Sequence, residues 1–177
     1  AADVNDAMTM SESRKLTIAG ILQSKTYYYT GFGKGDEIAN YSENMTSDGN
    51  SVKTVSIFFY GVNRADAADV NDAMTMSESR KLTITGILQS KTYYYTGFGK
   101  GDEIANYSEN MTSDGLSVKT VSIFWYGSNR ASAADVNDAM TMSETRKLTI
   151  DGVLQSKTYY YPGFGKGDER ADYSENF

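Results

Sequence analysis

A segment of 66 residues recurs in this chain and constrains its fold more than any other feature. The run Asp-Val-Asn-Asp-Ala-Met-Thr-Met begins at Asp3, at Asp69 and at Asp135, so the copies start 66 residues apart. Near-identity at a fixed period is typical of repeat proteins, in which each unit buries part of its surface on a neighbour. We therefore expect two full repeat units, residues 1–66 and 67–132, and a partial third, residues 133–177.

Each full unit is expected to hold a long module followed by a short one. The module bounds are 1–45, 46–66, 67–111 and 112–132, and the partial third unit, 133–177, is one more long module.

Short segments rich in Thr, Tyr, Val and Ile, separated by Gly, Asp and Asn, predict an all-β chain. Strands are expected over residues 25–30, 38–45 and 52–60, with a glycine-rich turn over 31–36. With two weaker segments at the start of each copy, the expectation is about five strands per 66 residues. The predicted architecture is a linear array of β-sandwich-like or solenoid-like modules.

The two weaker segments lie at the start of each copy. Residues 3–10 fit either helical or strand spacing, and a strand is favoured because Thr9, like the serines that follow, is a mediocre helix former. Residues 16–18 are expected to form a strand with Leu16 and Ile18 on one face.

Alternation over residues 52–60 predicts a core strand. The residues expected to be buried are Val55, Ile57, Phe59, Val121, Ile123 and Trp125. Lys53 and Lys119 are expected to be exposed.

Composition and charge exclude several classes of function. The net charge is −6 and no basic cluster occurs, so a nucleic-acid partner is not expected. No apolar run approaches the roughly 18 residues of a transmembrane helix, so membrane insertion is not expected. The chain has no Cys and no His, which removes disulfides and thiolate or imidazole metal sites. A repeat chain without exposed thiols suits an extracellular or cell-surface location.

The third copy differs from the first two at instructive positions. Ile38 and Ile104 become Arg170, and Asn40 and Asn106 become Asp172. An apolar position changed to Arg is what a terminal repeat needs when no neighbour covers its outer face. We expect residues 133–177 to be a C-terminal cap and the N-terminal face to be the stickier one; neutral drift is the alternative.

An enzyme needs convergent and differentiated groups, usually present once. Here every candidate group occurs two or three times in equivalent surroundings, and the adjacent carboxylates of Asp36 and Glu37 favour a solvated turn. We therefore expect no enzymatic activity and assign no catalytic residue.

The run Asp3-Val4-Asn5-Asp6 resembles the Asp-x-Asn-Asp calcium-binding linker of cadherins, whose carboxylate and amide oxygens suit a hard cation. The resemblance covers four residues, and the Asn-x-Pro that continues a cadherin linker is absent here. It implies calcium as the one candidate cofactor, with these ligands: Asp3, Asn5, Asp6, Asp69, Asn71, Asp72, Asp135, Asn137 and Asp138. An Asp- and Asn-rich turn between repeats is the alternative.

Two abutting Asn-x-Ser/Thr tripeptides occur in each of the first two copies. The candidate glycosylation sites are Asn40, Asn44, Asn106 and Asn110. If they are used, the chain is extracellular; if not, they are polar strand residues.

Aromatic, carboxylate and amide side chains at a constant pitch predict a candidate carbohydrate surface, because sugars stack on aromatic faces. Its residues are Tyr28, Phe32, Asp36, Asn40, Tyr94, Phe98, Asp102, Asn106, Tyr160, Phe164 and Asp168. Packing of the rings between sheets or repeats is the alternative.

The sequence thus predicts an extracellular structural or adhesive repeat protein that acts through a repeated β surface. Its expected partner is a second copy, through head-to-tail or strand-edge association. The alternative is a multivalent, lectin-like module that binds glycans at one site per repeat.

Overall fold

The computed structural model describes residues 6–163 and 165–177, and its regular structure is almost entirely antiparallel β-strand. The all-β expectation is confirmed. The chain divides into two compact units, residues 1–88 and 89–177, which are described separately. Their boundary falls inside the second sequence copy.

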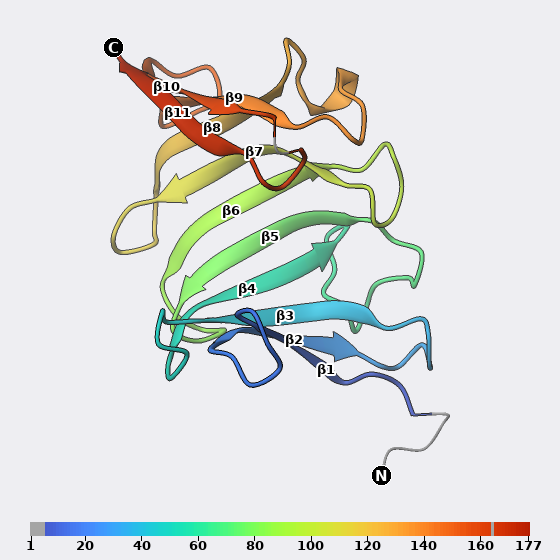
Figure 1. Cartoon of the computed structure of the whole chain (residues 1–177). Coiled ribbons are helices and arrows are strands. Elements are labelled where there is room, and N and C mark those ends of the chain that lie inside the picture. Colours follow the sequence, from blue (N-terminus) through green and yellow to red (C-terminus); the bar gives the residue numbers. More distant parts are fainter. Residues whose placement is uncertain (1–5, 164) are drawn as a thin grey trace. The chain divides into compact units, whose positions relative to one another are not determined.

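The first unit consists of five strands, each paired with the next one along the chain (Figure 1). Their bounds are β1 Met10–Arg14, β2 Leu22–Tyr29, β3 Ile38–Met45, β4 Val52–Tyr60 and β5 Met74–Lys81. The strands predicted over 25–30, 38–45 and 52–60 are confirmed.

The second unit follows the same plan, and β6 begins at the boundary residue Leu88. Its strands are β6 Leu88–Tyr95, β7 Ile104–Met111, β8 Val118–Tyr126, β9 Met140–Lys147, β10 Leu154–Tyr161 and β11 Arg170–Asn176. One turn of 3-10 helix, η1 at Ala131–Ala133, follows β8.

Two architectural expectations were wrong. Among the described residues, four strands, not five, occupy each full 66-residue period, because the two weak segments at the start of a copy contribute one strand between them. The strands of each unit also lie in one sheet, so neither unit is a two-sheet sandwich.

The predicted strand at Leu16–Ile18 is instead part of the loop that joins β1 to β2. The Lys15 amide donates to the Ile21 carbonyl at 2.9 Å, which closes a tight loop, and Leu16 has a φ of 65°. That left-handed conformation is rare for a residue with a branched side chain and is incompatible with a strand. Both Leu16 and Ile18 are exposed.

The predicted strand at residues 3–10 was also largely wrong. Residues 1–5 lie outside the described part of the chain, but in the later copies the Asp-x-Asn-Asp run is a turn and the strand begins at Met74 or Met140. Polar side chains that bond the nearby backbone explain this, because such bonds compete with strand pairing.

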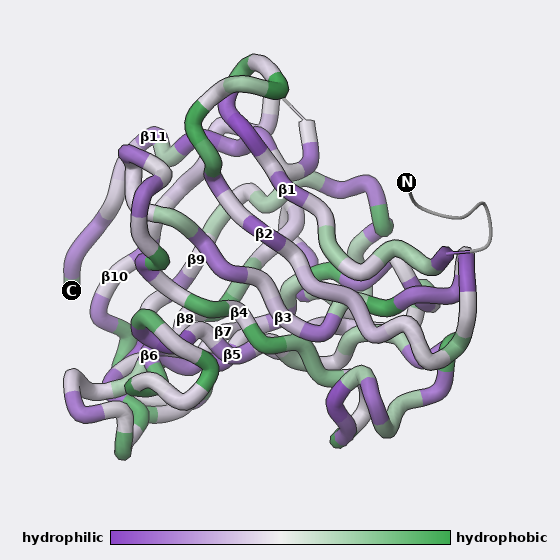
Figure 2. Tube along the Cα trace, turned by 90° about the horizontal axis from the view of Figure 1, so that it is seen from below, coloured by the Kyte–Doolittle hydropathy of each residue, from purple (hydrophilic) through white to green (hydrophobic). Residues whose placement is uncertain are grey.

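The strand register defines two faces in the first unit, since directly paired residues share a face. Hydrophobic and hydrophilic residues are interleaved along the strands rather than gathered in long runs (Figure 2). The hydroxyl face carries the row Ser11, Thr26, Ser42, Ser56 and Ser79. The tyrosine face carries two rows: Met10, Tyr27, Tyr41, Ile57, Glu78; and Glu12, Lys25, Glu43, Val55, Arg80.

The predicted core strand is confirmed in most positions. Val55, Ile57 and their equivalents Val121 and Ile123 are buried, and Lys53 and Lys119 are exposed. Phe59 and Trp125 are only half-buried.

A second group of buried side chains lies where the long and short modules meet. In the first unit it contains Ile38, Tyr60 and Ala65, and in the second Ile104, Tyr126, Ala131 and Ala134. Ile38 is therefore covered by the short module of its own repeat. The expectation that Ile38 makes the N-terminal face sticky was wrong for this reason.

Candidate functional site

The contact between the long module and the short module recurs in both complete copies. In the first unit the Tyr60 hydroxyl donates to the Ala39 carbonyl at 2.8 Å, and the Arg64 guanidinium donates to Asn40 Oδ1 at 2.6 Å. We call this arrangement the clasp. It joins β3 to β4 and to the segment after β4.

The second unit repeats the clasp almost atom for atom. Tyr126 donates to the Ala105 carbonyl at 2.7 Å and Arg130 donates to Asn106 Oδ1 at 2.7 Å. Each arginine also lies over the aromatic ring of the preceding strand, with 5.6 Å from Arg130 Cζ to the Trp125 ring centroid and the same distance from Arg64 to Phe59. This cation–π contact explains why a large aromatic residue stands at both positions.

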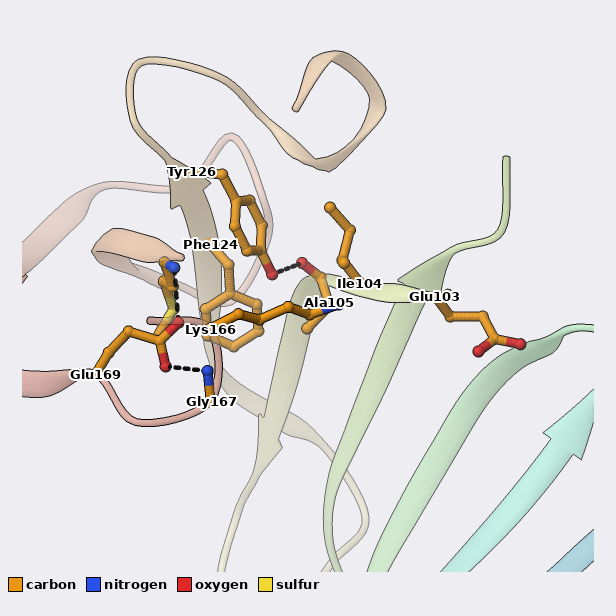
Figure 3. Close-up of a pocket in the computed structure, with 9 residues that line it drawn as sticks. Glu103, Ile104, Ala105, Phe124, Tyr126, Lys166, Gly167 and Glu169 are labelled. Carbon is orange, nitrogen blue, oxygen red and sulfur yellow. Dashed lines mark hydrogen bonds between the residues drawn. The ribbon is translucent and has the colours of Figure 1, made fainter. Parts of the chain in front are cut away.

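A hollow of about 260 Å³ opens beside the second clasp (Figure 3). Phe124 and Tyr126 of β8 form part of its wall, together with Ile104 of β7 and Glu169. The Glu169 carboxylate accepts hydrogen bonds from the amides of Met140 at 2.9 Å and Gly167 at 3.0 Å, so both of its oxygens have backbone partners. The hollow, which Glu103 and Lys166 also line, is smaller than the roughly 300–1,000 Å³ typical of small-molecule sites.

The equivalent glutamate of the first copy makes the same backbone clamp. Glu37 accepts from the Met8 amide at 2.8 Å and from the Gly35 amide at 3.0 Å. These hydrogen bonds, with that from Met8 the strongest, lower the pKa of Glu37. Glu37 therefore ties the turn after β2 to the start of the copy, a role that the solvated-turn interpretation missed.

A pair of stacked tyrosines recurs on the tyrosine face of every copy. The ring centroids of Tyr27 and Tyr41 lie 4.6 Å apart, and Tyr93–Tyr107 and Tyr159–Tyr173 stack at the same distance. The hydroxyl of Tyr27 donates to Glu43 at 3.1 Å, and the later copies repeat this bond, which places a carboxylate beside each aromatic pair.

The residues predicted to bind carbohydrate have separate environments in the structure. Phe32 packs edge-on against Tyr29 at 5.3 Å beside the buried cluster, and Asn40 is held by the clasp. The Tyr28 hydroxyl lies 3.0 Å from Ser11 Oγ, and Asp36 is exposed in its loop.

The later copies behave alike. Phe98 packs on Tyr95, Asn106 is in the second clasp, Tyr94 is half-buried, and Asp102 is exposed. In the third copy the Tyr160 hydroxyl is 3.2 Å from Ser143 and Asp168 is exposed, whereas Phe164 lies outside the described residues. Packing roles thus account for the rings at positions 32 and 98.

The four candidate glycosylation asparagines all use their amide groups within the sheet. Asn40 and Asn106 accept from the clasp arginines. The amide nitrogen of Asn44 donates to Thr54 at 3.3 Å and Ser56 at 3.0 Å, and that of Asn110 makes the same two bonds. A glycan on Asn44 or Asn110 would replace a hydrogen that now joins neighbouring strands.

The candidate calcium ligands of the second copy cap a turn. Asp69 Oδ1 accepts from the Asn71 amide at 2.9 Å, and Asp72 Oδ2 accepts from the Asp69 amide at 2.9 Å. Asp135, Asn137 and Asp138 repeat these bonds, whereas Asp3 and Asn5 lie outside the described residues and Asp6 is exposed. Within residues 6–163 and 165–177, no group of three or more acidic side chains is placed to hold a metal ion.

Several residues that organise the structure were not found from the sequence. They are Arg64 and Arg130 of the clasps, Glu37 and Glu169 of the backbone clamps, and Arg14, Arg80 and Arg146, each of which donates to the carbonyl of a loop glycine six residues later. Their recurrence at 66-residue intervals was the available signal, but recurrence alone does not name a partner.

Comparison with known protein families, with curated proteins and with solved structures finds no match to this chain. No helix in the described residues has the length and hydrophobicity needed to span a membrane.

Tyr126, the tyrosine of the second clasp, is buried, and we expect its ionisation to lower the stability of the fold at alkaline pH. Burial raises the pKa of Tyr126 to about 12, with smaller contributions from the charges of Glu169 and Tyr94. An unfolded tyrosine ionises near pH 10, so between about pH 10 and 12 the unfolded state loses a proton that the folded state keeps, and stability falls. We expect Tyr126 to contribute a loss of about 2 to 3 kcal/mol over this window.

Urea unfolding of the parent and of Tyr126→Phe from pH 9 to 12 measures this loss. The phenylalanine ring cannot ionise and cannot donate to the Ala105 carbonyl. The variant should therefore start less stable than the parent, and the two stability curves should converge above pH 10. Parallel curves would show that Tyr126 is not buried as described.

A second prediction concerns calcium. If the Asp-x-Asn-Asp runs are turns whose oxygens accept backbone amides, millimolar calcium should leave the melting temperature equal to that in a chelator, since a ligand specific to the folded state must raise it. The control is Asp69→Asn with Asp72→Asn. A calcium-dependent rise in the parent that this variant abolishes would establish a metal site and overturn the turn explanation.

Proposed function

We propose that the chain is a non-enzymatic structural or adhesive repeat protein, extracellular or at the cell surface, built as a linear array of 66-residue units. It acts through a β surface repeated in each unit and associates with copies of itself through strand edges. The observation that carries the proposal is the clasp, because the same contacts close the long module onto the short module in both complete copies.

The third copy differs from the others at the clasp. Arg170 and Asp172 stand where the first copy has the buried Ile38 and the clasp asparagine Asn40. Arginine is well solvated at an exposed position and isoleucine is not, so the third copy is suited to a position without a clasp, which fits an ordered, linear series of units.

The polar groups of the chain also support a structural function. The clasp arginines make the same bonds in both complete copies, and the glutamates of the backbone clamps accept the equivalent glycine amide in all three. A catalytic centre needs groups that differ from one another and are aimed at a shared reacting atom.

Glycan binding is a second candidate because of the stacked tyrosine pairs. Each pair has a glutamate at its hydroxyl end, and in the third copy Tyr173 is exposed. Aromatic faces beside carboxylates suit sugars, and three such pairs would add through effective concentration. Saturable sugar binding at about one site per copy would favour this candidate.

Insertion of further repeats tests the linear array. One and two extra copies of residues 67–132, placed after residue 132, should each lengthen the particle by the same increment in solution X-ray scattering. Four strands spaced by about 4.8 Å give up to about 19 Å per copy.

The matched control carries Arg and Asp in the inserted copy at the positions of Ile104 and Asn106. The particle with this inserted copy should not lengthen by the same increment, because the long module of the inserted copy cannot form the clasp. An unchanged maximum dimension, or a ring-like profile after the second insertion, would contradict the proposal.

A further inference from the structure

A groove in the second unit lies between the stacked tyrosines and the loop that follows β9. Its volume is about 210 Å³, and it is lined by Tyr107, Glu109, Val121, Leu148, Thr149 and Ile150. Sites that enclose a whole small molecule usually have roughly 300–1,000 Å³. The groove therefore has room for one ring-sized group of a larger ligand.

The loop wall of the groove is held in place by the protein itself. The amide of Leu148 donates to the Lys119 carbonyl of β8 at 3.3 Å, and the Arg146 guanidinium donates to the Gly152 carbonyl at 3.2 Å. The side chain of Leu148 nevertheless points into an open surface, since the residue is 55% exposed, and Ile150 is 37% exposed. A preorganised apolar wall loses little conformational freedom when a ligand covers it.

The opposite wall is an aromatic ring beside a carboxylate. Tyr107 stacks on Tyr93 with 4.6 Å between the ring centroids and 18° between the ring planes. The Tyr93 hydroxyl donates to Glu109 Oε2 at 3.1 Å. The buried Val121 lies across from Glu109 in the strand register. The ring and the carboxylate are thus fixed beside an aliphatic side chain.

Some polar atoms of the groove remain available to a ligand. Among the described residues, hydrogen bonds use one oxygen of Glu109 and neither hydroxyl of Tyr107 and Thr149. The groove therefore offers a carboxylate oxygen as an acceptor and two hydroxyls that can donate or accept. The clasp and clamp groups differ, because their polar atoms bond within the chain.

This combination of groups favours a sugar ring. A pyranose has C–H groups that pack on aromatic and aliphatic side chains, and hydroxyls that bond to carboxylates and hydroxyls. An ammonium ion would use the carboxylate but leave both hydroxyls of the groove without partners.

The charge of the groove favours an uncharged sugar. Glu109 is the one charged residue among the described residues that line it. Two cations lie on neighbouring strands, Arg146 paired with Glu144 and Lys91 across from Glu109, but neither lines the groove. An acidic sugar would bring its carboxylate against that of Glu109, and like charges in contact are unfavourable.

The first unit contains the same arrangement. Tyr27 and Tyr41 stack at 4.6 Å, and the Leu82 amide donates to the Lys53 carbonyl at 3.3 Å. Leu82 is 55% exposed, as Leu148 is. The residues that correspond to the groove are Tyr41, Glu43, Val55, Leu82, Thr83 and Ile84.

We propose that each unit binds one uncharged pyranose ring of a glycan in this groove, between the stacked tyrosine and the loop, with Glu43 or Glu109 accepting a sugar hydroxyl. This inference rests on glycan binding, the second candidate function above, and names its site and its class of sugar. The carbohydrate residues predicted from the sequence for the second copy do not line the groove: Tyr94, Phe98, Asp102 and Asn106.

Nuclear magnetic resonance of the chain with labelled isoleucine methyl groups tests the site. The ligands are the methyl glycosides of glucose, galactose and mannose, each compared with its uronate, which differs only by a carboxylate. For at least one neutral glycoside, the Ile84 and Ile150 methyl shifts should saturate while those of the clasp residues Ile38 and Ile104 stay constant. The matching uronate should bind at least about tenfold more weakly.

Two results of this titration would overturn the proposal in different ways. Saturable shifts confined to other isoleucines would refute the groove and leave glycan binding standing. No saturable shift with any neutral glycoside would refute both. Equal binding of a sugar and its uronate would contradict the role of the glutamates.

A double variant tests those glutamates. Glu43→Gln with Glu109→Gln keeps an oxygen for the tyrosine hydroxyl and should reduce the preference over the uronate to less than about threefold. The matched control is Asp36→Asn with Asp102→Asn, which removes two exposed carboxylates and should leave the preference unchanged. Equal losses in both variants would indicate net charge instead of the groove. If the first variant does not fold, as shown by the Ile104 methyl shift, the titration of the parent still decides.

Discussion

A strand in either unit is covered along its sheet edges by its neighbours in the chain, and the rest of the structure depends on this constraint. Antiparallel pairing proceeds in chain order, so burial at an inner strand depends on the strands directly before and after it. Ile38 and Ile104 are buried because the short module that follows each of them packs against it. The clasp is an example: the tyrosine that ends one strand donates to a carbonyl of the preceding strand, and the arginine that follows it donates to an asparagine of that preceding strand.

Many polar groups of the described residues take part in bonds that recur from copy to copy. Each charged residue that the structure places carefully, such as Glu37, Arg64 or Arg80, holds the backbone or the side chain of the same copy. These bonds fix loops and modules, and their copies recur with nearly the same lengths. This use of the charged groups supports the structural function proposed above.

Much of the fold could be predicted from the sequence because the relevant signals are local. Alternation over residues 52–60 and the Thr- and Tyr-rich run before the glycine turn identify strands without knowledge of their partners. The loop at Leu16 could not be predicted, because Leu-Thr-Ile has strand propensity and its left-handed leucine is imposed by Lys15, Ile21 and Arg14. The clasp was missed for a related reason: Arg64 and Asn40 are 24 residues apart, and only the register of β3 with β4 brings them together.

Hydrogen exchange compares β7 and β11 directly, since the two strands occupy equivalent positions but only β7 has a following strand among the described residues. The amides of β7 that face β8 should exchange at least about 100-fold more slowly than the equivalent outward amides of β11, because the latter have no ladder partner. Equal protection of the two strands would contradict the claim that pairing with the adjacent strand stabilises each strand of the sheet.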